Sequence, residues 1–127
     1  MFFSVVIPTY DRKPILAKCL LALENQQFGN SVADYEVIVV DDGSTDGTIE
    51  WLAANREDLS HVRSICQSHQ GPAAARNLGV EDAKGDTIIF IDSDLVVTEH
   101  FLQAHADALL QAYEDTDAVF TYGSVIN

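Results

Sequence analysis

The chain has 127 residues, of which 47% are hydrophobic, and it carries seven Lys and Arg residues for a formal net charge of −13. This length is typical of one domain, and the hydrophobic share is large enough for a buried core. With so few cationic residues, the chain is not expected to bind a partner mainly through contacts to a phosphate backbone. We therefore expect it to bind neither nucleic acid nor an anionic membrane surface. An anionic ligand would need a positive charge that the sequence does not encode, which points to a bound metal.

The N-terminus and the two cysteines carry no targeting or redox signal. The first apolar run lacks a basic region, is interrupted by Ser4 and is stopped by Pro8. We therefore expect no signal peptide, no membrane span and a cytoplasmic location. Cys19 falls in a helical pattern and Cys66 in a strand pattern, with no C-x-x-C spacing, so both are predicted to be small core residues.

Short β-branched runs alternate with helical patterns along the whole chain. The pattern predicts strands at residues 3–7, 36–40, 62–66, 87–91 and 118–125, and helices at residues 14–23, 48–55, 72–83 and 100–113. The strand runs are apolar at consecutive positions, which is typical of strands covered on both faces of a parallel sheet. The alternation predicts right-handed crossovers and a doubly wound, mostly parallel α/β sheet with helices on both faces, in a single domain over residues 1–127.

Polar clusters follow three of the predicted strands. They are residues 8–11 after the first strand, residues 41–44 after the second and residues 92–94 after the fourth. Each cluster alone is also what a strand-to-helix turn and a helix N-cap require. In a doubly wound sheet, however, ligands bind outside the carboxyl ends of the strands, where the strand order reverses. We therefore expect the three clusters to converge on one site.

The acids in these clusters predict a metal. Two unit charges about 4 Å apart repel by roughly 4 kcal/mol at an effective dielectric constant near 20, so a cation or raised pKa values must relieve the repulsion. Carboxylate oxygens, with no Cys or His nearby in the sequence, suit Mg²⁺ or Mn²⁺ better than Zn²⁺.

Four segments together resemble family 2 glycosyltransferases. They are residues 4–12 (SVVIPTYDR), 37–48 (VIVVDDGSTDGT), 71–79 (GPAAARNLG) and 92–94 (DSD). Their order, spacing and strand context match the family over nearly the whole chain, although a D-x-D triplet alone would be weak. The resemblance implies a GT-A, Rossmann-like fold, a nucleoside diphosphate sugar donor that is usually a uridine one, and a metal-dependent inverting transfer.

The resemblance also implies roles for the residues on the base side of the site. Pro8, Thr9 and Tyr10 would line the base pocket, with Tyr10 offering a ring face to the nucleobase. Asp42, with Asp41 beside it, would hydrogen-bond the base, because a carboxylate can accept from a pyrimidine imide N–H.

On the diphosphate side, the resemblance places Asp92 and Ser93 against the ribose and diphosphate, and Asp94 on the metal. Asp11 stands where the family commonly has asparagine, and it adds negative charge near the base pocket. Arg76 would pair either with the diphosphate or with an acid of the site, and both interpretations stay open.

An inverting transfer also needs a general base beside the acceptor hydroxyl. In the family this base is an acid in the second half of the catalytic domain, and this chain ends at Asn127 before that region. Glu114, Asp115 and Asp117, around the far end of the last predicted helix, are expected to be out of reach. We therefore expect a truncated catalytic domain that binds the donor, and we name no general base and no acceptor among sugars, lipids and proteins.

Other interpretations account for part of the pattern. A naturally short, non-catalytic nucleotide-sugar-binding module would keep the same donor-side residues, and the sequence leaves it open. A receiver domain of two-component signalling has the same size and alternation, but there the acid pair ends the first strand and a lysine ends the fifth. His100 and His105 have a spacing that could suggest a metal pair, yet we expect them to be surface or core histidines.

Overall fold

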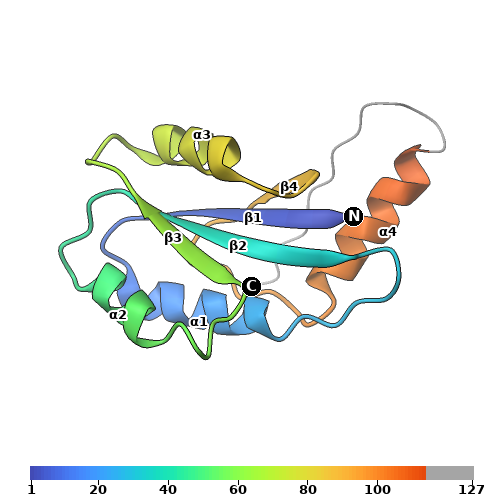
Figure 1. Cartoon of the computed structure of the whole chain (residues 1–127), viewed down its shortest axis with the longest axis horizontal. Coiled ribbons are helices and arrows are strands. Elements are labelled where there is room, and N and C mark those ends of the chain that lie inside the picture. The colour runs from blue at the N-terminus through green and yellow to red at the C-terminus, as the bar shows by residue number, and fades with distance from the viewer. Residues whose placement is uncertain (114–127) are drawn as a thin grey trace.

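The structure is a computed structural model that describes residues 1–113, and it confirms the alternation of strands and helices (Figure 1). The elements are β1 (Phe2–Thr9), α1 (Lys13–Glu24), β2 (Asp34–Asp41), α2 (Thr48–Ala54), β3 (Val62–Cys66), α3 (Pro72–Asp82), β4 (Thr87–Phe90) and α4 (Phe101–Tyr113). Pro14 and Pro72 lie in the first turns of α1 and α3, where a missing N–H costs nothing. The strand predicted at residues 118–125 lies outside the described residues, as do Glu114, Asp115 and Asp117.

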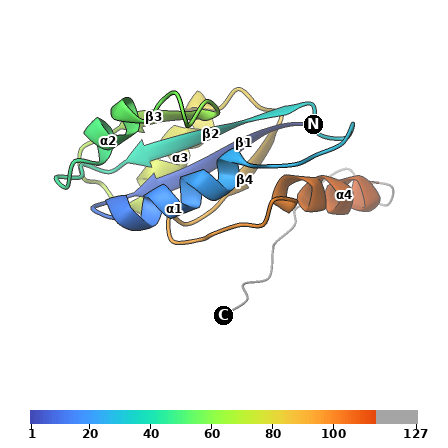
Figure 2. The same ribbon diagram turned by 90° about the horizontal axis from the view of Figure 1, so that it is seen from below.

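The strands form one parallel sheet in the order β3-β2-β1-β4. Helices α1 and α2 cover one face and α3 covers the other, which is the predicted doubly wound arrangement (Figures 1 and 2). The larger core includes Leu20 of α1, Val37 of β2 and Leu102 of α4, whereas Ala75 of α3 packs in a smaller cluster on the opposite face. The central strands β1 and β2 are buried almost throughout, which explains their uninterrupted apolar runs.

The strands at the edges of the described sheet are less covered, and this corrects one prediction. Cys19 is fully buried, as expected, but Cys66 is exposed because it ends β3, which has a neighbour on one side only. Burial and the nearby charge of Asp41 still raise the pKa of the Cys66 thiol above its usual value.

The strand order reverses between β1 and β4, and this fixes where a ligand can bind. From β1 the chain moves outward through β2 to β3, and α3 then carries it back across the sheet to place β4 on the other side of β1. Helix α3 sits close to the sheet because Gly79 faces it; a Cβ at this position would lie 2.4 Å from Val6 Cγ1. The crevice between the carboxyl ends of β1 and β4 is therefore the expected binding position.

Candidate functional site

A cleft of about 460 Å³ opens at this crevice. Its lining brings together residues from the ends of β1, β2 and β4 and from α3, so the strand-end clusters converge as predicted. The lining residues are Pro8, Thr9, Tyr10, Arg12, Asp42, Pro72, Arg76, Asp92, Ser93 and Asp94.

The end of β1 supplies one wall of the cleft. Thr9 pairs with Asp41 in the parallel register, and its carbonyl accepts a 2.9 Å hydrogen bond from the Asp42 N–H, which joins the ends of β1 and β2. The Thr9 side chain is buried, and its Oγ1 has no hydrogen-bond partner among the described residues. Tyr10, one residue further, is 44% exposed and lines the cleft.

Asp42 is the most tightly held acid of the cleft. Its side chain is 5% exposed, and four donors surround its two oxygens. Oδ1 accepts from Gln67 Nε2 at 2.8 Å and from the Gln70 N–H at 2.7 Å, and Oδ2 accepts from the Gly71 N–H at 3.0 Å and lies 2.9 Å from His69 Nδ1. Burial opposes the charged form, but these hydrogen bonds and the His69 charge outweigh it and lower the pKa of Asp42. Asp42 is thus an ionised carboxylate whose acceptor positions are all occupied.

Two acids predicted for the site, Asp11 and Asp41, lie outside the cleft lining. Asp11 has a positive φ of 49°, and it links two loops: its N–H donates to Ser44 Oγ at 2.9 Å and its Oδ1 accepts from the Thr45 N–H at 2.7 Å. Asp41 is buried, with one oxygen accepting from the Ser44 N–H at 3.3 Å and the other without a hydrogen-bond partner among the described residues. Contact of either acid with a base stays a prediction.

The loop after β4 is open by comparison. Asp92 and Asp94 are exposed, and Ser93 between them is buried. Arg76 Nη2 lies 3.3 Å from Asp92 Oδ1, and both side chains are solvent-accessible, at 39% and 66%. A pair this exposed contributes little to stability, so Arg76 and Asp92 remain free to exchange partners for a ligand.

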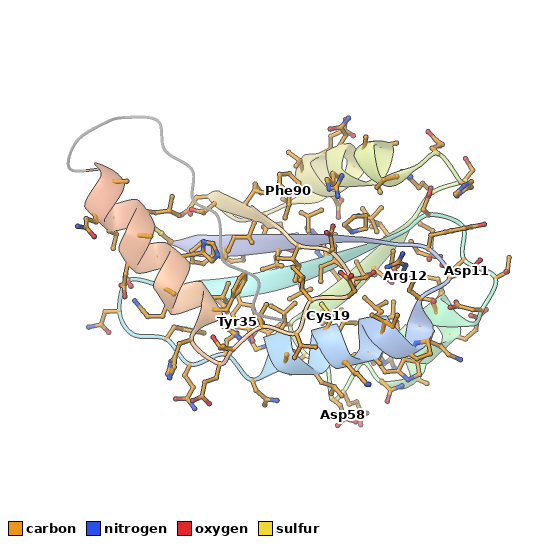
Figure 3. All side chains as sticks on the ribbon, turned by 180° about the vertical axis from the view of Figure 1, so that it is seen from behind. Asp11, Arg12, Cys19, Tyr35, Asp58 and Phe90 are labelled. Atoms are coloured by element: carbon orange, nitrogen blue, oxygen red, sulfur yellow. The ribbon has the colours of Figure 1, made fainter. Side chains whose placement is uncertain are left out.

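Sequence reasoning missed two residues of the lining and two contacts of Asp42. Arg12, in the loop between β1 and α1, adds a second guanidinium to the cleft besides Arg76; Figure 3 shows it with Asp11 at the end of the sheet opposite α4. Pro72 was recognised only as a helix start. Gln67 and His69 precede the segment at residues 71–79 directly, and that proximity was the available signal. His100 is exposed and His105 is half-buried, and neither lines the cleft.

A parallel α/β sheet with a polar cleft at its switch point is typical of nucleotide-binding folds. Residues 4–126 match the family model described as Glycosyl transferase family 2. An uncharacterized glycosyltransferase of Haemophilus influenzae is 35% identical over 122 residues, covering 95% of this chain and 46% of that protein. The poly(ribitol-phosphate) beta-N-acetylglucosaminyltransferase TarS of Staphylococcus aureus is 33% identical, covering 87% of this chain and 20% of TarS.

Solved structures of glycosyltransferases have a similar fold. TarS residues 1–349 in complex with UDP-GlcNAc superpose with a TM-score of 0.75 at 31% identity, covering 90% of this chain and 32% of that one. The mannosyltransferase PcManGT of Pyrobaculum calidifontis, in complex with GDP-Man and Mn²⁺, superposes with a TM-score of 0.60 at 29% identity, covering 72% and 27%. The chain belongs to glycosyl transferase family 2, and its sheet matches the GT-A fold of TarS. It spans less than half the length of these relatives.

Family membership rules out the receiver-domain interpretation. Within residues 1–113, no helix is both long enough and apolar enough to cross a membrane.

Proposed function

We propose that this chain is the donor-binding half of a glycosyltransferase that takes a nucleoside diphosphate sugar, with uridine as the base, and transfers the sugar with inversion to an acceptor. The observation that carries the proposal is the cleft at the β1–β4 switch point. It is lined by Tyr10 and Asp42, which follow the ends of β1 and β2, and by Arg76, Asp92 and Asp94, from α3 and the loop after β4. Structures of TarS with UDP-GlcNAc and of PcManGT with GDP-Man support this class of donor.

We propose a divalent metal, Mn²⁺ or Mg²⁺, held by Asp94. The described residues contain no cluster of three or more His, Cys, Asp or Glu side chains that could hold a metal by itself. The exposed Asp94 carboxylate, with Asp92 in the same cleft, fits a different type of site, in which one or two protein carboxylates share the metal with substrate phosphates and water. A metal bound there would neutralise negative charge that develops on the leaving diphosphate.

The other residues of the cleft would bind the base, the ribose and the phosphates of the donor. Tyr10 would stack on the base, and the guanidinium groups of Arg12 and Arg76 would pair with phosphate oxygens, because arginine forms charge-assisted bonds to phosphate. Ser93 would face the ribose and diphosphate, and Pro8 and Thr9 would complete the base wall. These groups all act on the donor, and the chain spans less than half the length of its relatives, so we expect the isolated chain to bind donor without transferring sugar.

Calorimetry with UDP, ADP and NAD tests the donor assignment. UDP should bind most tightly, and Tyr10→Ala should cost about 1 to 3 kcal/mol of UDP binding, the usual value of a base–aromatic stack. Phe28→Ala is the matched control, because Phe28 is also a solvent-accessible ring, at 38%, but does not line the cleft. Equal affinity for the three nucleotides, or equal losses for the two variants, would refute the assignment.

A further inference from the structure

His69 makes two contacts at the cleft that the proposed function assigns to the nucleobase. Its ring lies over Tyr10, with 4.2 Å between the ring centroids and 31° between the planes. Its Nδ1 lies 2.9 Å from Asp42 Oδ2 and 3.2 Å from the Asp42 carbonyl oxygen. Both neighbours are acceptors, so Nδ1 must carry a proton and donate it.

The other donors to Asp42 are fixed in place. The N–H groups of Gln70 and Gly71 belong to the backbone just before α3. Gln67 Nε2 donates a second hydrogen bond, of 3.4 Å, to the Gly71 carbonyl. The His69 side chain, in contrast, is 60% exposed and can rotate into solvent without moving the backbone. A base can therefore reach Asp42 most easily by taking the position of the imidazole.

We propose that the His69 side chain is an internal competitor of the nucleobase: in the free protein it covers the Tyr10 ring and occupies Asp42 Oδ2, and the base displaces it. This inference rests on the proposed donor site. The displacement also predicts base specificity. A base that replaces both contacts needs a ring face and an adjacent N–H donor, as the uracil imide provides. A base without such a donor leaves Oδ2 with the Gly71 N–H as its remaining donor, and losing one hydrogen bond is costly at a largely buried carboxylate.

Competition of this kind lowers the apparent affinity by the fraction of molecules in which the side chain has moved away. If that fraction is about one in ten, removing the imidazole should tighten base binding about tenfold. A ring that only walls the pocket would act in the opposite direction, because its removal would weaken binding.

The test compares His69→Ala with the unmodified chain in calorimetric titrations of uridine, UDP and inorganic pyrophosphate. We expect uridine and UDP to bind about tenfold more tightly to the variant and pyrophosphate to bind equally to both. His61→Ala is the matched control, because His61 also stacks on a tyrosine, with 4.1 Å between the His61 and Tyr35 ring centroids, and pairs with Glu24, but neither Tyr35 nor Glu24 lines the cleft. It should change none of the three affinities.

Histidine NMR provides a second readout. Saturating uridine should break the Nδ1–H hydrogen bond of His69 and shift its Nδ1 resonance, while His61 stays unchanged. If His69→Ala binds uridine more weakly than the unmodified chain, or equally well, while Tyr10→Ala still lowers UDP affinity, the competitor role is overturned and the donor assignment stands. If neither the unmodified chain nor His69→Ala prefers uridine nucleotides to adenine ones, both the donor assignment and the competitor role fail.

Discussion

Glu36 at the amino end of the sheet and Asp92 at the carboxyl end are held in opposite ways. At the amino end, Glu36 is 10% exposed and accepts from Ser4 Oγ at 2.7 Å, from Arg63 Nε at 2.8 Å and from the Lys84 N–H at 2.7 Å. At the carboxyl end, the Asp92 side chain is 66% exposed and has one polar contact within residues 1–113, at 3.3 Å, to Arg76. Glu36 joins three neighbouring segments and holds the fold together, whereas Asp92 is available to a ligand.

The same distinction separates acids within the carboxyl end. Asp46 accepts from the Lys13 N–H at 2.9 Å and from the Thr48 N–H at 3.1 Å, so it joins the starts of α1 and α2. Burial would raise the pKa of Asp46, but hydrogen bonds from Thr48 and from the Lys13 N–H outweigh it and lower that pKa. Position at a strand end therefore does not by itself make an acid part of the ligand site.

The largest effect on stability should come from Glu36→Ala. This change leaves Ser4, Arg63 and the Lys84 N–H without their shared acceptor, and we expect a loss of roughly 3 kcal/mol in the free energy of unfolding. Asp92→Ala, the matched change at the other end, should stay within about 0.5 kcal/mol. Urea denaturation of both variants measures their free energies of unfolding. Equal losses would show that Glu36 and Asp92 contribute alike to stability, contrary to this prediction.

Gly85→Ala should follow, with a loss of about 2 kcal/mol, because overpacking forces the backbone to shift. A Cβ at Gly85 would lie 2.6 Å from both the Phe2 carbonyl oxygen and Ser4 Oγ, where the Gly85 N–H now donates to Ser4. Gly29→Ala is the control, since its Cβ would meet its nearest neighbour at 3.7 Å. Thermal unfolding that shows no difference between the two variants would contradict this packing.

The pH dependence of stability should show the same network with a smaller effect. Burial works against ionised Glu36, but hydrogen bonds from Ser4, the Lys84 N–H and Arg63 outweigh it and hold the pKa below its ordinary value of 4.5. A lowered folded-state pKa stabilises the protein above the unfolded-state value, and this stability is lost as the pH falls through the folded-state value. We expect Glu36→Gln to flatten the decline of unfolding free energy between about pH 5 and pH 3 by about 1 kcal/mol. An unchanged slope would show that ionisation of Glu36 does not contribute to the pH dependence of stability.

The smallest change in stability should come from Arg76→Ala. Its one ion pair is solvent-accessible on both sides, so unfolding free energy should change by less than about 0.5 kcal/mol. UDP affinity should nevertheless fall, since a phosphate contact of Arg76 would be lost. A variant that loses stability but keeps UDP affinity would show that Arg76 has a structural role and does not bind the donor.

For residues 1–113 the sequence was sufficient to predict the fold, because its strongest signals are local. Consecutive apolar residues mark β1 and β2, and helix-starting prolines mark α1 and α3. The exposure of Cys66 was mispredicted because it depends on the strand order, which periodicity does not encode.

The site was predictable as a place more than as a set of contacts. Strand-end clusters located the cleft, but the partners of Asp42 come from Gln67, His69 and the backbone at the start of α3. These residues are distant in sequence, and only the crossover from β3 to α3 brings them there. Whether an acid is open or satisfied depends on such long-range neighbours, and the spacing of residues alone cannot reveal it.

We propose that the exposed acids Asp92 and Asp94 bind a diphosphate through a metal, and UDP titration with Mn²⁺ and with EDTA tests this proposal. We expect chelation to weaken UDP binding by more than about 100-fold, and Asp94→Asn to remove most of the Mn²⁺ effect, because metal-site changes that spare the ligands already cost about 10- to 100-fold. Asp86→Asn is a control at the amino end, where Asp86 Oδ1 accepts from the Phe2 N–H. UDP affinity that EDTA leaves unchanged, or a full Mn²⁺ effect in Asp94→Asn, would contradict the account.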